Sequence, residues 1–121
     1  MPATDRRRQA EKAGRRAETL ALWWLRLKGW RLVARDFRTP VGEIDLVVRR
    51  GRLLALVEVK RRASLAAAAE AIRPEQRGRI ARAAEALLKR RPDLAVCDLR
   101  FDAVLLAPGH RPRHIIAAWE M

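Results

Sequence analysis

Two short apolar runs joined by a basic turn constrain the fold of this chain more than any other feature. Residues 43–48 and 53–60 are rich in β-branched and aliphatic side chains with an alternating pattern, which is typical of β-strands. The segment Arg49-Arg50-Gly51-Arg52 separates them. This spacing predicts an antiparallel hairpin in which Arg50-Gly51 forms the two-residue loop.

The predicted hairpin brings two carboxylates onto one face of a sheet. With that loop, Asp45 lies opposite Leu56 and diagonal to Glu58. Lys60 shares the face of Glu58, because successive side chains of a strand point to opposite sides. Diagonal neighbours on paired strands are about 7–8 Å apart. A hard cation with oxygen ligands at about 2.0–2.1 Å can bridge that gap once the side chains converge. The hairpin is therefore compatible with a Mg²⁺ site.

The same residues have an ordinary structural interpretation. Antiparallel sheets often carry acids on a wet face, where Glu58 and Lys60 would form a solvated ion pair of little energetic value. Against this, Leu56 shares the face of Glu58, while Val57 and Val59 cover the other face. An acid on a strand that is apolar on both faces needs a partner or an ion. Spacing alone leaves both interpretations open.

The charge of the chain favours a polyanionic partner. The 121 residues include 27 Lys and Arg against 14 Asp and Glu, a formal net charge of +13. This excess indicates nucleic acid rather than a neutral metabolite, although an anionic membrane surface also fits. The length and the 50% hydrophobic content predict one globular domain.

The apolar segments and the cysteine content indicate a cytoplasmic protein. The first residues contain no hydrophobic signal core, and the longest uncharged run is residues 103–110. We therefore expect a protein that is neither exported nor membrane-spanning. The single cysteine, Cys97, has no partner for a disulfide and is expected to be a small buried hydrophobe.

The first part of the chain predicts a basic arm followed by a helix. Residues 1–12 are basic and polar without apolar periodicity, which indicates a flexible N-terminal arm. Across residues 13–28 apolar side chains recur at three- and four-residue steps, which predicts a helix that ends at Gly29. Glu18 lies one turn before Leu22, so part of its helical face is apolar.

Later segments predict a sheet with helices. The expected elements are a strand at 30–37, a turn at 39–42, a short helix or loop at 63–72, a helix from Pro74 to about Arg91, one or two strands within 94–106 and a terminal strand at 114–119. Together with the hairpin, the order is helix, three strands, helix and two strands. We therefore expect one α/β domain over residues 13–121, with a central mixed β-sheet flanked by α-helices.

Several motifs resemble one known family. They are Glu18 in the first predicted helix, Gly42-Glu43-Ile44-Asp45-Leu46, Glu58-Val59-Lys60 and Arg100-Phe101-Asp102. From about Gly14 to Trp119 the chain resembles the small bacterial YraN-like proteins. That family is similar in turn to archaeal Holliday junction resolvases and belongs to the PD-(D/E)xK nuclease superfamily. The resemblance implies a single restriction-endonuclease-like domain with helices on both faces of a mixed sheet.

The resemblance also implies roles for individual residues. The implied ligands of Mg²⁺ or Mn²⁺ are Asp45, Glu58, the Val59 carbonyl and, from the first helix, Glu18. Lys60 would position or activate the attacking water, and Gln76 resembles the polar helical residue that faces the site in the superfamily. Asp102 would support either the sheet or the site. Glu75 replaces an expected lysine and Asp36 an expected asparagine, which weakens the case for phosphate contacts at those positions.

Arginines gather near the predicted site elements. They are Arg15, Arg16, Arg61, Arg62, Arg73, Arg77, Arg79 and Arg82. This cluster predicts a groove that follows phosphates with salt-dependent, sequence-independent affinity, and generic surface charge is the alternative. Trp23 is the tryptophan best placed to stack on a base. The tryptophans whose spacing is typical of core residues are Trp24, Trp30 and Trp119. No catalytic role is assigned to His110 or His114.

Three functional hypotheses follow. The first is a Mg²⁺- or Mn²⁺-dependent endonuclease acting on DNA in repair or recombination, with a preference for branched or junction DNA that comes from the resemblance. The second is a non-cleaving DNA-binding module that recruits a partner, although such a module has no need for repulsive acids among its arginines. The third is a basic protein that docks on RNA or on an acidic protein. A two-fold homodimer would supply the paired sites that junction resolvases use.

Overall fold

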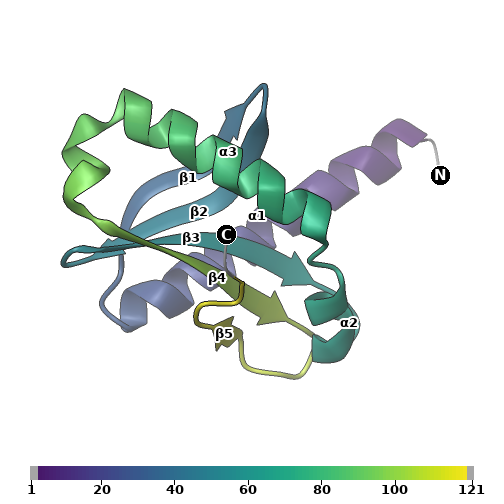
Figure 1. Ribbon diagram of the computed structural model, residues 1–121. Coiled ribbons are helices and arrows are strands. Elements are labelled where there is room, and N and C mark those ends of the chain that lie inside the picture. Colours follow the sequence, from purple (N-terminus) through teal and green to yellow (C-terminus); the bar gives the residue numbers. More distant parts are fainter. Residues whose placement is uncertain (1–2, 120–121) are drawn as a thin grey trace.

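A five-stranded mixed sheet forms the centre of the molecule, and the computed structural model describes residues 3–119 (Figure 1). The strands lie in sequence order and are β1 (Arg31–Thr39), β2 (Gly42–Arg50), β3 (Leu53–Arg61), β4 (Asp98–Leu106) and β5 (Arg113–Ile115). The β3–β4 pair is parallel and the other neighbouring pairs are antiparallel. The predicted α/β class with a mixed sheet is confirmed.

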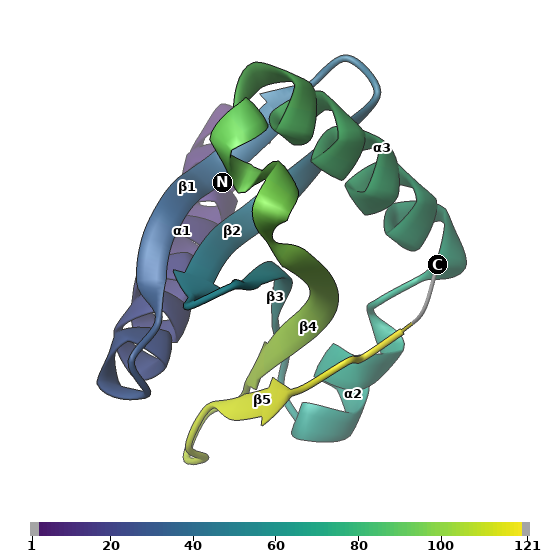
Figure 2. The ribbon, with the colours of Figure 1, turned by 60° about the vertical axis from the view of Figure 1, so that its left-hand side comes forward.

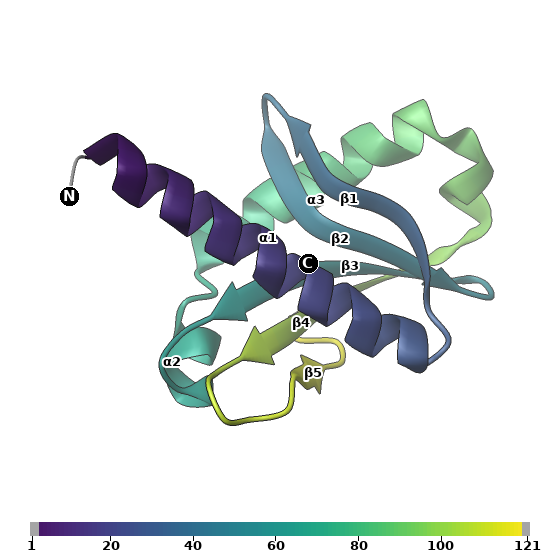
Figure 3. The ribbon, with the colours of Figure 1, turned by 180° about the vertical axis from the view of Figure 1, so that it is seen from behind.

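Helices cover both faces of the sheet. α1 (Ala3–Leu27) crosses one face, and its N-terminal half extends past the strands (Figure 3). The opposite face carries α2 (Leu65–Glu70), α3 (Pro74–Arg90) and the short 3₁₀ helix η1 (Pro92–Val96) (Figure 2). A parallel strand pair needs such a crossover between its strands, and here α2, α3 and η1 provide it between β3 and β4.

The sheet separates two hydrophobic cores. β3 alternates, so Leu54 and Leu56 face α3 while Ala55 and Val57 face α1. The α3-side core includes Ile44, Val47, Leu54, Leu56, Ile80, Ala83 and Leu87. The α1-side core includes Ala17, Ala21, Leu22, Leu25, Leu46, Val48 and Val57. Each fully buried Leu, Ile or Val stabilises the fold by about 1.5–3 kcal/mol. Both helices are therefore held firmly against the strands they cover.

The hairpin between β2 and β3 turns one residue later than predicted. Arg50 pairs with Leu53, so the two-residue loop is Gly51 and Arg52 rather than Arg50 and Gly51. Gly51 has a φ of 63°, and a type II′ turn takes glycine at its first loop position because that position needs a positive φ. The register changes by two positions, so the residues that remain paired keep their predicted faces, since the side-chain repeat is two. Ile44, beyond the last pair, instead lies with Val47 in the α3-side core.

Gly42 begins β2 at a close contact with the backbone of α3. A Cβ atom at position 42 would overlap the backbone carbonyl of Arg79 on α3. A glycine is therefore required here by contact with a neighbouring backbone. The contact fixes the separation of α3 from β2 at the end of the sheet where the motif carboxylates lie.

Two helical segments differ from the sequence expectation. α1 begins at Ala3, so the predicted start at Ala13 is wrong. Residues 6–12 carry Arg, Gln, Ala, Glu and Lys, which are strong helix formers and extend the helix without any apolar stripe. Motion of this segment as a flexible arm stays a prediction. Between 63 and 72 the helical alternative is correct: Ser64 caps α2 by accepting a hydrogen bond from Ala67 N at 3.0 Å.

The last part of the chain also differs. The strand expected within 94–106 starts at Asp98, after η1. The terminal strand expected over 114–119 ends at Ile115, because Ala117 adopts a φ of 50°, which no strand accommodates. Trp119 is buried through stacking on Phe101 rather than through strand pairing. Cys97, expected to be buried, is half-buried against the α3-side core.

A buried carboxylate holds this C-terminal region together. Asp102 on β4 has 0% exposed surface and accepts hydrogen bonds from Arg100 Nε and Nη2 at 2.8 Å and from Ala117 N at 3.0 Å. His114 Nε2 lies 2.7 Å from its Oδ2 atom. Burial alone raises the pKa of Asp102, but the hydrogen bonds from His114, Arg100 and Ala117 outweigh it and bring the pKa to about 2. Asp102 therefore supports the sheet.

Candidate active-site cleft

A cleft of about 610 Å³ opens where α1 crosses the ends of β2 and β3. Its walls come from α1, the two strands, the segment after β3 and the start of α3. It brings together every residue predicted for the catalytic and metal site, namely Glu18, Asp45, Glu58, Val59, Lys60 and Gln76. Segments far apart in the sequence thus converge on one hollow, which is the usual arrangement of a binding or catalytic site.

The two central acids lie where β2 and β3 separate. The last pair of the two strands is Leu46 with Val57, and the next residues toward the cleft are Asp45 and Glu58. Asp45 is therefore not opposite Leu56 as predicted, because the hairpin loop begins one residue later. Its Oδ2 atom accepts a hydrogen bond from the backbone N–H of Val59 at 2.8 Å, in place of a strand carbonyl. Because β2 and β3 separate here, the Asp45 side chain lies between them and accepts the hydrogen bond that a backbone carbonyl of β2 would otherwise accept.

Burial and mutual repulsion perturb both carboxyl groups. Burial, and then the negative charge of Asp45, raise the pKa of Glu58 to about 7, although Lys60 lies 3.2 Å from its Oε1 atom. Burial also raises the pKa of Asp45 by more than the Val59 N–H and the Lys60 charge lower it. Two acids this close cannot both ionise easily without more positive charge nearby. The pair therefore has the electrostatic character of a cation site.

Lys60 and Gln76 contact each other in the lining of the cleft. In the amide orientation that satisfies both of its ends, Gln76 donates to the Ala71 carbonyl at 3.1 Å and accepts from Lys60 Nζ at 3.0 Å. The Lys60 ammonium thus lies between Glu58 and Gln76. An ammonium has three donors, so these contacts leave one for a water or a phosphate oxygen. Lys60 is both the counter-ion of Glu58 and a group available to a substrate.

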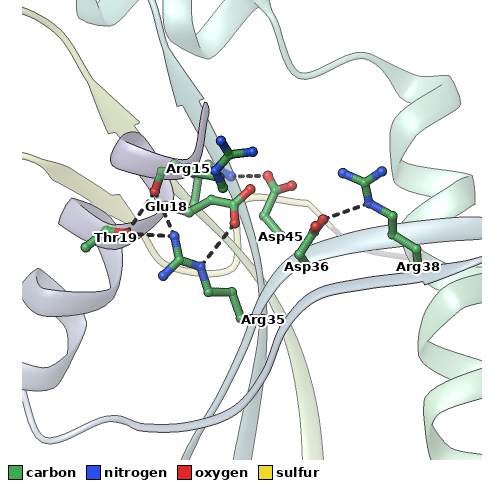
Figure 4. Close-up of polar contacts among 8 residues, drawn as sticks. Arg15, Glu18, Thr19, Arg35, Asp36, Arg38 and Asp45 are labelled. Carbon is green, nitrogen blue, oxygen red and sulfur yellow. Dashed lines mark hydrogen bonds and ion pairs between the residues drawn. The ribbon is translucent and has the colours of Figure 1, made fainter. Parts of the chain in front are cut away.

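Glu18 reaches the cleft from α1 but is paired with an arginine. Arg35 Nε lies 3.4 Å from Glu18 Oε1, and Arg35 Nη2 donates to Thr19 Oγ1 and to the Arg15 carbonyl, each at 2.7 Å. Figure 4 shows the Glu18 carboxylate with Arg35 on one side and Asp45 on the other. Burial first, and then the charges of Asp45 and Asp36, raise the pKa of Glu18 against the opposing effect of Arg35. The Glu18 carboxylate thus adds to the negative charge of the cleft.

The donor atoms fit a hard divalent cation by their chemistry. Carboxylate oxygens are the ligands that Mg²⁺ and Mn²⁺ prefer, and the raised pKa values mean that burial disfavours the ionised carboxylates, the form that a cation would stabilise. Within residues 3–119, however, no three His, Cys, Asp or Glu side chains are already grouped as an ion site. Asp45 and Glu58 would hold the metal, with Lys60 beside Glu58 at 3.2 Å, whereas Glu18 would first have to exchange Arg35 for the ion.

The predicted phosphate-binding arginines divide into separate groups. Arg61 and Arg62 line the cleft itself, beside Lys60. Arg15 and Arg16 lie on α1 and line a neighbouring hollow. Arg73 and Arg77 do not line the cleft, and Arg77 instead lies 5.8 Å from the centroid of the Trp119 ring. The structure therefore places four of the eight predicted arginines at or next to the cleft, and Arg79 lines a small hollow that shares Glu58 and Gln76 with the cleft.

Two residues at or beside the cleft, Glu43 and Arg35, are not predicted from the sequence. Glu43 lines the cleft beside Asp45 and helps to raise its pKa. Its position in the Gly42-to-Leu46 motif was a usable signal, but only Asp45 was assigned from that motif. The second is Arg35 on β1. Its contact with Glu18 joins β1 to α1, and no spacing in the sequence indicates it.

Together these features define an α/β domain whose sheet opens into a cleft containing an acidic pair and a lysine. The model of the family described as "Uncharacterised protein family UPF0102" matches residues 17–106, and the chain belongs to this family. The predicted membership of the YraN-like family is thereby confirmed.

Relatives cover nearly the full chain. A UPF0102 protein of Parvibaculum lavamentivorans is 60% identical over 91% of this chain and 83% of its own length. One from Paramagnetospirillum magneticum is 50% identical over 99% of this chain and 96% of its own length. One from Maricaulis maris is 53% identical over 96% of this chain and 91% of its own length. Within residues 3–119 no helix combines the length and the apolarity needed to cross a bilayer.

Proposed function

We propose that the protein is a Mg²⁺- or Mn²⁺-dependent endonuclease with a restriction-endonuclease-like fold that acts on DNA in repair or recombination. The observation that supports this most is the convergence of Asp45, Glu58 and Lys60 in one cleft, with the pKa of Glu58 raised to about 7. Structural ion pairs perturb pKa values as well, but they do not require a cleft bordered by Arg61 and Arg62.

The side chains suit hydrolysis of a phosphodiester. The chemistry that a bound Mg²⁺ or Mn²⁺ supplies is neutralisation of charge at the scissile phosphate and activation of water. Asp45 and Glu58 would hold the ion. Lys60 Nζ, oriented by Glu58 and Gln76, has a donor with which to position the attacking water or bind a non-bridging phosphate oxygen. The overall step breaks a P–O bond and adds water, and the leaving oxygen takes the proton.

A second function is favoured by a specific observation. Arg35 holds Glu18, and Lys60 holds Glu58, so the acids have partners before any ion binds. This arrangement suits a DNA-binding module that keeps the fold, does not cut and recruits another protein. The raised pKa values weigh against it, because the local cations do not fully stabilise the carboxylates.

The test of the proposed function is a cleavage assay on defined DNA structures. Purified protein is incubated with labelled four-way junction, flap, duplex and single-stranded DNA in Mg²⁺, in Mn²⁺ and in EDTA. We expect metal-dependent cutting, strongest on a branched substrate, and none in EDTA. Tight binding without cutting on every substrate would instead support the recruiting module. Binding to RNA alone would contradict both functions. A protein that acts on chromosomal DNA in a bacterium would act in the cytoplasm. Paired cuts across a junction would require two copies of the chain.

Arg61 and Arg62 are expected to contact phosphates. Their replacement by alanine should weaken DNA binding to a similar degree on all sequences and reduce the slope of log affinity against log salt by about 1 per arginine. Fluorescence anisotropy at several salt concentrations in EDTA measures both effects. Arg31→Ala is the control, because Arg31 is an exposed arginine at the other end of the β1–β2 pair. An equal loss in the control would show that total charge, rather than the cleft, determines affinity.

A further inference from the structure

We propose that the outer face of α1 binds a single-stranded DNA segment that leaves the cleft. The lining of this face, the α1 groove, consists of Lys12, Arg15, Arg16, Thr19, Leu20 and Trp23. The inference rests on the proposed function, because the strand it binds is one arm of the DNA in the cleft. It adds a substrate class, namely DNA with an unpaired tail or flap.

The α1 groove combines positive charge with an exposed aromatic ring. It has a volume of about 540 Å³, and none of its lining residues is acidic. Lys12, Arg15 and Arg16 lie within about one helical turn of one another, so their charges act on the same stretch of a bound chain. Trp23 is 57% exposed and Leu20 is 52% exposed. Cations that hold a phosphate backbone beside a ring that stacks on a base are the usual elements of a single-strand site.

The Trp23 ring is supported but not covered. The guanidinium of Arg26, one turn further along α1, lies 5.3 Å from its centroid. Such a cation–π contact limits the motion of the ring. In Figure 3, α1 lies in front of the sheet, and no other described element covers its outer side. The other tryptophans contrast with this one: Trp30 and Trp119 are buried, and Trp24 is half-buried.

A continuous path joins the α1 groove to the cleft. A hollow of about 410 Å³ between them shares Arg16 and Leu20 with the α1 groove and shares Arg61 and Pro108 with the cleft. A strand leaving the cleft over Arg61 would therefore meet Arg16 and then Trp23. Along the helix, Arg16 and Trp23 are about 10 Å apart. One short segment of a bound strand can therefore contact both residues.

The chemistry of the groove favours a single DNA strand over other occupants. A base in a duplex is stacked on its neighbours, so only an unpaired base offers a free face to Trp23. A second copy of this chain would bring Lys12, Arg15 and Arg16 against a surface of a molecule with a formal charge of +13. Charge repulsion therefore opposes self-association through this face.

The test is DNA binding in EDTA, which separates binding from cleavage. Anisotropy is measured for labelled oligothymidylate, flap DNA and blunt duplex with the wild type, Trp23→Ala and Trp23→Phe. We expect Trp23→Ala to lose about tenfold in affinity for oligothymidylate and for the flap, with duplex binding changed less than about twofold. Trp23→Phe should keep most of the affinity. Leu27→Ala is the matched control, since Leu27 is 80% exposed on α1 but does not line the groove.

The outcomes separate this inference from the proposed function. If Trp23→Ala binds all three DNAs like the wild type while the wild type cuts DNA, the inference fails and the proposed function stands. If the wild type neither binds nor cuts any DNA, the proposed function fails as well. Two further results would also overturn the inference: preferential binding of oligouridylate, or dissociation of a dimer by Trp23→Ala in sedimentation without loss of DNA affinity.

Discussion

Replacing Asp45 with asparagine is expected to abolish DNA cleavage while leaving DNA affinity unchanged or higher. Asparagine keeps an oxygen that accepts the hydrogen bond from Val59 N, so the local fold is retained. It removes one of the charges that would hold the metal and that repel the phosphate backbone. Loss of a residue that only supports a metal ligand typically costs about 10–100-fold in activity, so loss of a ligand should exceed about 100-fold.

The measurement is single-turnover cleavage of the best substrate, with binding followed in parallel in EDTA. Glu43→Gln is the matched control, because Glu43 is an acid that lines the same cleft but is not among the predicted ligands. A smaller loss in this variant would show that the effect belongs to Asp45 and not to cleft charge in general. Unchanged cleavage by Asp45→Asn would remove this site from consideration. Equal losses in cleavage and affinity would indicate a binding role for Asp45.

Replacing Asp102 with alanine is expected to destabilise the fold by about 3–5 kcal/mol, since removal of one partner leaves a buried charge uncompensated. Arg100, the His114 ring and Ala117 N would all lose their acceptor. Urea unfolding followed by tryptophan fluorescence measures the change. The matched control is Asp93→Ala, because Asp93 also pairs with an arginine two residues before it but lies on the surface with 57% of its side chain exposed, so no measurable change is expected. Similar losses in both variants would contradict the structural role of Asp102.

The same carboxylate predicts part of the acid sensitivity of the protein. The pKa of Asp102 is about 2 in the folded state, below its ordinary value of 3.8. A carboxyl group with a lowered pKa stabilises the fold above its unfolded pKa, and this contribution is lost as the pH falls toward the folded pKa. The wild type should therefore lose stability between about pH 4 and pH 2, and Asp102→Asn should lose less over that interval. An identical pH profile for the variant would show that other groups determine acid unfolding.

The local pattern of the sequence predicted the β2–β3 hairpin and the convergence of its two acids. An error of one residue in the loop was harmless, because the register changed by two and side-chain faces repeat every two residues. The hydrophobic alternation of 53–60 and Pro74 at the start of α3 were also sufficient for their elements. These features depend on residues that are close together in the sequence, so the sequence alone is enough to predict them.

The parts that could not be predicted depend on contacts between distant segments. Nothing near Arg35 in the sequence indicates that it meets Glu18 across the interface of β1 and α1. Likewise, the end of β5 follows from a turn at Ala117 whose N–H is bound by Asp102 on another strand. The N-terminal part of α1 was missed for a different reason: an exposed helix needs helix-forming residues rather than an apolar stripe.

The missing side chain of Gly42 has a consequence beyond its own strand. The Arg79 carbonyl occupies the space that a methyl group at position 42 would need, and Gln76 lies about one helical turn before Arg79 on α3. A larger residue would push that turn outward and take the Gln76 amide away from the Lys60 ammonium, which it contacts at 3.0 Å. The distance between α3 and the sheet, and with it the alignment of a lysine on the neighbouring strand β3, thus depends on the absence of a side chain at one position of the family motif.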